Sequence, residues 1–234
     1  MSSSASATGA RRGRPGYDQA AVLRIAVEAF TEYGYDATSM GMLAERLGIS
    51  KSAIYHHVPS KVEILRLALD QALIPLEAVF DSEQAKQGPA LDRLVHVLRS
   101  TLSVLFAEFP YVTLLLRLRG NSEVETDALH RRRVLDRRVA DLVAQAQAEG
   151  SLRSDVSPTP VARFLFGTVN SLTEWYRPGG SLTPAEAERI LLAIMLDGLR
   201  TRAAVHDDSA HAGAPGSQGA GPGAAEAVGV PRVD

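Results

Sequence analysis

Arginine, the side chain best suited to bind phosphate groups, is concentrated in two stretches of the chain. Arg11, Arg12 and Arg14 lie together near the N-terminus, and seven more arginines stand at positions 117, 119, 131, 132, 133, 137 and 138. The guanidinium group stays charged and presents five donors in a planar fork that fits phosphate oxygens. Both stretches could therefore bind phosphates. In the second stretch, pairing with nearby acidic residues on a solvated helix face explains any single arginine as well.

The residue types that carry catalysis or hold metals form no recognisable pattern. The chain has no cysteine, which excludes disulfides, Cys-ligated metals and a thiol nucleophile. The adjacent pair His56 and His57 would project in different directions from a helix, and the four remaining histidines lack ligand-like spacing. GxSxG, P-loop and HExxH motifs are absent. The sequence therefore predicts no enzyme, no cofactor and no metal site.

Two further side chains with binding chemistry lie towards the C-terminal end. The segment 161–176 keeps its apolar residues on one helical face and carries Asn170 on a different face from Leu172 and Trp175. The Asn170 amide could bond a ligand carbonyl or phosphate, or it could face a partner helix. Trp175, at the end of this segment, could line a pocket or simply anchor the packing.

The elements that position these side chains are helices throughout. Apolar residues recur at helical spacing, strand-like alternation is absent, and turn residues separate the helical stretches. The fold class is therefore predicted to be all-α. The expected helices span about 18–33, 39–47, 50–57, 59–80, 90–108, 110–118, 122–149, 160–176 and 183–205. The last of these is apolar almost all round from 190 to 199, which predicts cover from its own domain and from a partner subunit.

The two short helices 39–47 and 50–57, joined by Gly48, have the pattern of a helix-turn-helix. Ala44 is small where the two helices must cross, and Gly48 supplies a turn with positive φ. A miniature core is expected from Leu43, Leu47, Ile49 and Ile54. These constraints are met together, which makes the assignment strong.

Charge and composition agree with this organisation. The net charge is −2, but residues 1–61 hold seven Lys and Arg against five Asp and Glu, so the N-terminal part is the basic one. Residues 1–16 and 207–234 lack apolar content and are predicted to be a disordered basic arm and a disordered tail. No apolar run suggests export or membrane insertion, so a cytoplasmic location is expected.

Residues 18–65 resemble the N-terminal signature of the TetR family of regulators. The matching residues are Ala29-Phe30, Gly34-Tyr35, Thr38, Ala44, Gly48, Ser50, Tyr55 and Lys61. The resemblance implies a three-helix helix-turn-helix domain at 17–62, and a helical ligand-binding and dimerisation domain at 63–206. It also implies a homodimeric repressor of palindromic operator DNA that a small effector releases. Val58 replaces the family's usual Phe, and Gly41 lies inside the second helix.

The same resemblance implies which residues contact DNA. Helix 50–57 would be the recognition helix in the major groove, begun by Ser50. Thr38, Ser39 and Lys61 would contact phosphates. Base edges or phosphates would be reached by Lys51, Ser52, Tyr55 and His56. Arg12 and Arg14 would enter the minor groove, unless the arm is only a solvated tail.

The stretch 170–180, with 164–167 and 149–155 before it, resembles a branch of the family that responds to acyl-CoA thioesters. That resemblance implies an acyl-CoA effector, with Asn170 and Trp175 in the pocket and Arg117 among the phosphate partners. Phe106 and Phe166 are candidates to line an acyl chain, as are Leu102, Leu115 and Leu118. The alternative is a hydrophobic, drug-like inducer of an efflux-pump repressor. Such pockets favour aromatic residues and buried carboxylates, and the C-terminal domain has few aromatics.

Overall fold

The computed structural model describes residues 18–200. The predicted arm, including Arg12 and Arg14, and the tail 207–234 lie outside the described residues. Within them the chain forms ten helices and no strand beyond one isolated bridge between Leu152 and Arg200. The prediction of an all-α fold is confirmed. The helices are α1 Gln19–Tyr33, α2 Met40–Leu47, α3 Lys51–His57, α4 Lys61–Asp81, α5 Glu83–Lys86, α6 Ala90–Ala107, α7 Phe109–Leu116, α8 Glu123–Ala148, α9 Pro158–Trp175 and α10 Pro184–Asp197.

Short polar side chains start most of these helices by capping free backbone N–H groups. The hydroxyl of Ser39 accepts from the Met42 N–H, and that of Ser50 accepts from the Ala53 N–H, both at 3.2 Å. Between these two helices Gly48 adopts a left-handed conformation with φ +66°. Its N–H closes the end of α2, so the expected glycine turn is present.

Helices α1 to α3 pack on one another around a small apolar core, and α1 also packs on α4. Leu43, Leu47 and Ile54 are buried there, while Ile49 is only partly covered. Val58, which replaces a larger residue of the family pattern, has no exposed surface. The smaller side chain is therefore accommodated by close packing, and the helix-turn-helix forms a compact unit.

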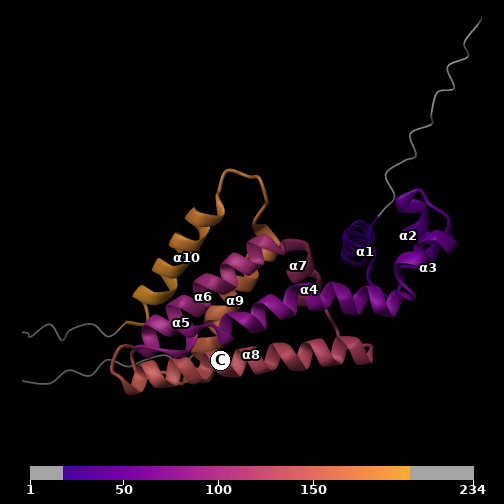
Figure 1. Ribbon diagram of the computed structural model, residues 1–234. Helices are drawn as coiled ribbons and strands as arrows, with labels where there is room; N and C mark the ends of the chain where they lie inside the picture. The colour runs from indigo at the N-terminus through magenta and orange to yellow at the C-terminus, as the bar shows by residue number, and fades with distance from the viewer. Residues whose placement is uncertain (1–17, 201–234) are drawn as a thin grey trace, which may run out of the picture. The chain divides into compact units, whose positions relative to one another are not determined.

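Helix α4 leaves this unit and continues into the second set of helices (Figure 1). It packs against α1 at one end and against α6, α7 and α8 along the rest of its length. Pro75 lies inside α4 and has no N–H, so one backbone hydrogen bond of the helix is missing there. The same helix therefore touches both the DNA-binding motif and the core of the larger domain.

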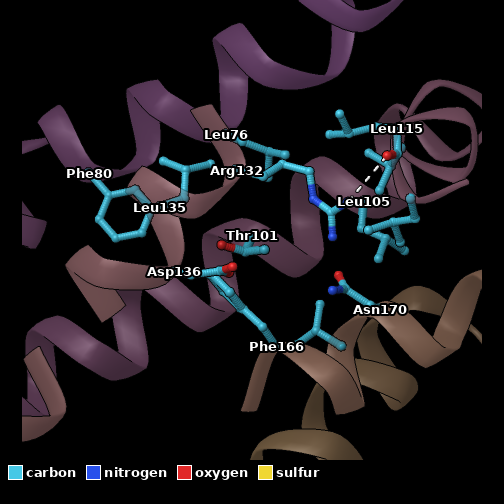
Figure 2. Close-up of a pocket in the computed structure, with 13 residues that line it drawn as sticks. Leu76, Phe80, Thr101, Leu105, Leu115, Arg132, Leu135, Asp136, Phe166 and Asn170 are labelled. Carbon is cyan, nitrogen blue, oxygen red and sulfur yellow. Dashed lines mark hydrogen bonds between the residues drawn. The ribbon is translucent and has the colours of Figure 1, made fainter. Parts of the chain in front are cut away.

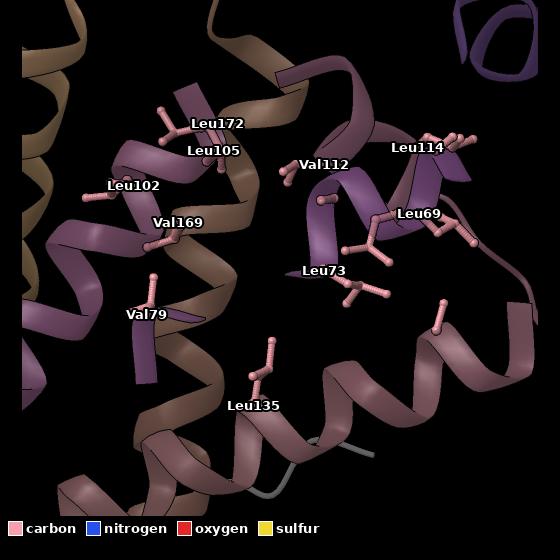
Figure 3. Packing of buried hydrophobic residues seen from close by; sticks show 14 of the residues in the cluster. Leu69, Leu73, Val79, Leu102, Leu105, Val112, Leu114, Leu135, Val169 and Leu172 are labelled. Atoms are coloured by element: carbon pink, nitrogen blue, oxygen red, sulfur yellow. The ribbon is translucent and has the colours of Figure 1, made fainter. Parts of the chain in front are cut away.

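The core of the larger domain is built from the facing apolar stripes of α4, α6, α7, α8 and α9 (Figure 3). Leu73 of α4, Leu105 of α6, Val112 of α7, Leu135 of α8 and Val169 of α9 are among its buried residues. Helix α10 covers α6 and α9 from outside. The short helix α5 was not expected from the sequence, because four residues are too few to show a periodic pattern. None of the described helices is long and apolar enough to cross a membrane.

The two glycines of the helix-turn-helix give a matched stability test. A Cβ at Gly48 would meet no atom within 4 Å, so only the left-handed backbone opposes a side chain. We expect Gly48→Ala to destabilise the protein by about 1 kcal/mol. Gly41 lies inside α2, where an added Cβ would meet only the Ser39 hydroxyl at 3.6 Å. Gly41→Ala should therefore stabilise by roughly 0.5 kcal/mol. Urea unfolding measures both, and equal signs for the two variants would contradict this account.

Candidate functional site

Helix α3 presents one polar face to solvent and one apolar residue to the core. Lys51, Ser52, Tyr55 and His56 are exposed, whereas Ile54 on the opposite side is fully buried. This division follows from the helical period, which places the four exposed residues on a different face of the helix from Ile54. The Ser50 hydroxyl lies 3.0 Å from that of Ser52 while it caps the helix. The exposed face therefore offers hydroxyl, phenol, imidazole and ammonium groups that could contact the base edges in a DNA groove.

The three residues expected to touch phosphates occupy different settings. Ser39 is exposed at the N-terminus of α2, where free N–H groups and the helix dipole favour an anion. Thr38 is buried, and its hydroxyl donates to the Gly34 carbonyl at 2.8 Å. The Lys61 ammonium donates to the Tyr35 carbonyl at 2.9 Å and lies 4.3 Å from the centre of the Tyr35 ring. Thr38 and Lys61 therefore also hold the turn between α1 and α2.

Besides α4, the packing of α1 on α7 and two hydrogen bonds join the DNA-binding motif to the larger domain. Arg117, at the end of α7, donates from Nη1 to the Thr31 carbonyl of α1 at 3.2 Å. Asn121 donates to the Asp36 carboxylate at 3.3 Å. Arg117 therefore bridges the two helical units and does not line the pocket described next.

An apolar pocket lies inside the larger domain (Figure 2). Its enclosed space is about 40 Å³, which admits water but no larger molecule. Five helices contribute to its wall: Leu76 and Phe80 of α4, Thr101 and Leu105 of α6, Val112, Leu115 and Leu116 of α7, Arg132, Leu135 and Asp136 of α8, and Phe166, Val169 and Asn170 of α9.

Three polar side chains of this pocket lack good partners in the part of the chain that the structure describes. The Thr101 hydroxyl is buried and makes no hydrogen bond. Arg132 makes one long hydrogen bond, from Nη1 to the Leu115 carbonyl at 3.4 Å. The Asn170 amide points into the same end of the pocket as the Arg132 guanidinium (Figure 2). An unpaired buried hydroxyl such as that of Thr101 is costly, and all three groups can donate, so this arrangement is suited to a ligand that supplies acceptors.

Desolvation shifts the pKa values of two charged side chains of the pocket in opposite directions. It lowers the pKa of Arg132, although an arginine remains protonated at neutral pH. It raises the pKa of Asp136, against the lowering effect of Arg132, Arg163 and Arg137. The pocket therefore combines a poorly solvated cation with a carboxylate that loses part of its hydration.

The predicted effector residues divide between the pocket and its surroundings. Phe166 and Asn170 line it, as does Leu115, whereas Leu102 and Leu118 do not. Phe106 packs on Tyr176, with ring centres 5.0 Å apart. Trp175 is half exposed, and its indole N–H donates to the Ser171 hydroxyl at 3.4 Å.

Thr101 and Asp136 were not predicted from the sequence as pocket residues, and nothing in the sequence distinguished Arg132 from the neighbouring arginines. A threonine on the otherwise apolar face of α6 was the available signal for Thr101. For Asp136 and Arg132 the deciding fact is which helix face meets α9, which requires the tertiary structure.

A different surface, on α9 and α10, exposes large apolar side chains. Phe164 is 76% exposed, Ile194 is 68% exposed, and Ile190 and Trp175 are also accessible. A hollow of about 390 Å³ lies between the two helices and is lined by Phe164 and Ile194, among others. Large exposed apolar side chains grouped on two neighbouring helices are typical of interaction sites. We call these four residues the α9–α10 face.

A helix-turn-helix unit joined to a helical domain with an internal pocket defines a DNA-binding transcriptional regulator. The family model of bacterial regulatory proteins of the tetR family matches residues 22–68. That of the tetracyclin repressor-like C-terminal domain matches residues 87–199. The chain belongs to the TetR family, whose members are regulators rather than enzymes. The resemblance inferred from the sequence is confirmed.

Individual relatives agree with this assignment. The HTH-type transcriptional repressor KstR2 of Rhodococcus jostii (strain RHA1) is 31% identical over 190 residues, which cover 76% of this chain and 89% of that protein. SCO3833, a TetR-family regulator from Streptomyces coelicolor A3, is 47% identical with a TM-score of 0.72, covering 77% of this chain and 91% of that one. AibR, solved with isovaleryl coenzyme A and operator DNA, has a TM-score of 0.65 at 22% identity, covering 76% and 97%. The last likeness concerns the fold alone.

Proposed function

We propose that the protein is a dimeric repressor that binds palindromic operator DNA and releases it when an acyl-CoA thioester enters the pocket. The DNA-binding domain would span residues 17–62, and the effector-binding and dimerisation domain would span 63–206. The observation that carries the effector proposal is the apolar pocket, in which the Thr101 hydroxyl has no hydrogen bond and the Arg132 and Asn170 side chains lie at one end.

The chemistry of the pocket favours an acyl thioester over a lipophilic cation. Leucine, valine and phenylalanine side chains form most of the wall and suit an acyl chain. A thioester carbonyl only accepts hydrogen bonds, and Arg132 and Asn170 can both donate to it from the same end of the pocket. A cationic ligand would be repelled by Arg132, and Asp136 is the one lining group that favours it. AibR supports the proposal only by showing that this fold can hold an acyl-CoA.

Effector binding would act on DNA through α4. The enclosed space of about 40 Å³ is far below the roughly 150 Å³ of an engineered cavity that binds benzene. An acyl chain must therefore push the lining helices apart. Leu76 and Phe80 lie directly after Pro75, where the missing hydrogen bond makes α4 easiest to bend. Helix α4 begins four residues after the recognition helix, so its displacement would alter the spacing of the two recognition helices in a dimer.

The first prediction concerns DNA. Lys61→Ala should weaken binding to all sequences alike and lower the slope of log affinity against log salt by about one, because it removes a phosphate contact. Ser52→Ala and His56→Ala should instead change sequence preference. Lys86 lies on α5, away from the motif, so Lys86→Ala is the charge-matched control. Mobility shifts at several salt concentrations measure these effects.

Lys61 also bonds the Tyr35 carbonyl, so thermal unfolding must accompany this measurement. An unchanged salt slope in a folded Lys61→Ala protein would show that Lys61 only stabilises the turn between α1 and α2 and does not contact a phosphate.

The second prediction concerns the dimer, which we expect to form through the α9–α10 face as an intersubunit four-helix bundle. Ile194 and Phe164 are mostly exposed in the single chain, so Ile194→Glu and Phe164→Glu should leave the fold intact and produce monomers. Ile74, 59% exposed on α4, is the control, because Ile74→Glu adds the same charge outside this face. Sedimentation at micromolar concentration decides, and dimers in both α9–α10 variants would contradict the assignment.

The third prediction concerns the effector. Thr101→Val removes a buried hydroxyl that has no partner, so the free protein should lose no stability. Acyl-CoA affinity should fall about fivefold, since one hydrogen bond to the ligand is lost. Asn170→Ala should also weaken binding and leave the operator occupied when effector is added. Thr113 already bonds the Phe109 carbonyl and does not line the pocket, so Thr113→Val is the matched control.

Calorimetry with a panel of acyl-CoAs measures these affinities. If none binds and a lipophilic cation does, the protein is instead a repressor with a drug-like inducer.

A further inference from the structure

A further hollow shares a lining residue with the pocket and is lined by arginines. It lies between α8 and α9 and has a volume of about 220 Å³. Arg133 and Arg137 of α8 and Arg163 of α9 line it, and we call it the arginine groove. Its other lining residues are Asp136, Ala140, Thr159 and Ala162.

The three arginines of the groove differ from Arg131 and Arg138 in having no ion-pair partner within the described residues. Within the described residues, none of Arg133, Arg137 and Arg163 has a carboxylate oxygen within 4 Å. Arg131 and Arg138, on other faces of α8, pair with acidic residues of α4. Arg133 and Arg137 are also four residues apart on one helix, where like charges repel. An anion bound between them would reduce this repulsion.

The N-terminal turn of α9 adds to the positive potential. Thr159 lies in this first turn and lines the groove. Pro158 and Pro160 have no N–H, and the Ser157 side chain makes no capping bond, so the Thr159 N–H is the donor of this turn nearest the groove. The end of an 18-residue helix carries a partial positive charge that favours an anion beside the guanidinium groups.

The groove and the apolar pocket share Asp136 as a lining residue. Seven residues separate Asn170, in the pocket, from Arg163, in the groove, which is about 10 Å along α9. A ligand with its acyl group in the pocket would therefore extend past Asp136 and place a polar end among the arginines. One carboxylate opposes three guanidinium groups there, so the groove keeps a net positive charge.

We propose that the arginine groove binds the phosphate groups of the coenzyme A moiety while the pocket holds the acyl group. This inference rests on the proposed function. Arginine is the appropriate residue because its fork donates two hydrogen bonds to one phosphate. Recognition of the acyl-CoA over the free acid then comes from the groove, since only the coenzyme A moiety reaches it.

The test compares two ligands with the same acyl group. One is the acyl-CoA, and the other is the acyl N-acetylcysteamine thioester, which has no phosphate. Arg133→Gln, Arg137→Gln and Arg163→Gln should each weaken acyl-CoA binding about tenfold, and the triple variant more. Binding of the truncated thioester should not change. Arg119 lines neither hollow, so Arg119→Gln is the control for loss of one positive charge.

Adenosine 3′,5′-bisphosphate serves as a second probe and should compete with acyl-CoA for the wild-type protein but not bind the triple variant. If the single variants bind acyl-CoA as tightly as the wild type, the groove assignment is overturned while the proposed function stands. If neither thioester binds the wild type, the proposed function itself fails. The three arginines are exposed, so glutamine should leave the fold intact, which thermal unfolding verifies.

Discussion

The burial of one helix, α4, is the constraint on which the rest of the structure depends. Its first turns complete the core of the helix-turn-helix, and its later turns complete the core of the larger domain. Arg131 of α8 reinforces the second contact by pairing with both Asp70 and Glu77 at 2.7 Å. Arg138 of α8 also stabilises this contact, because its guanidinium group lies over the ring of Phe80 in α4. These contacts hold α4 on both sides of Pro75, so its bending at that residue is opposed by packing and by charge.

The pocket lies where this packing is least complete. A buried hydroxyl without a partner costs about 1 to 3 kcal/mol, and Thr101 carries such a hydroxyl. Arg132 is held in the same wall with one long hydrogen bond. A domain selected for stability alone would replace these groups with apolar ones. The proposed ligand would satisfy these groups.

The sequence predicted most of the fold because the helical signals are local. Helix bounds agree to within two residues over most of the chain, since serines and glycines mark the ends of the helices. The helix-turn-helix was recognisable from Ala44, Gly48 and Ile54, whose roles depend on neighbours only a few residues away. The effector site was predicted less well, because its wall comes from five helices spread over about a hundred residues. Periodicity shows that a residue faces inward, but not whether it meets side chains or a cavity.

The three consecutive arginines of α8 show this division most clearly. The sequence by itself determined that Arg131, Arg132 and Arg133 point in different directions, because successive helical residues are rotated by about 100°. Only the tertiary structure decided what each one meets. Arg131 pairs with carboxylates of α4, Arg132 enters the apolar pocket, and Arg133 lines the groove beside α9. The reason is that the environment of a helix face is set by the helices packed against it, and these lie far away in the sequence.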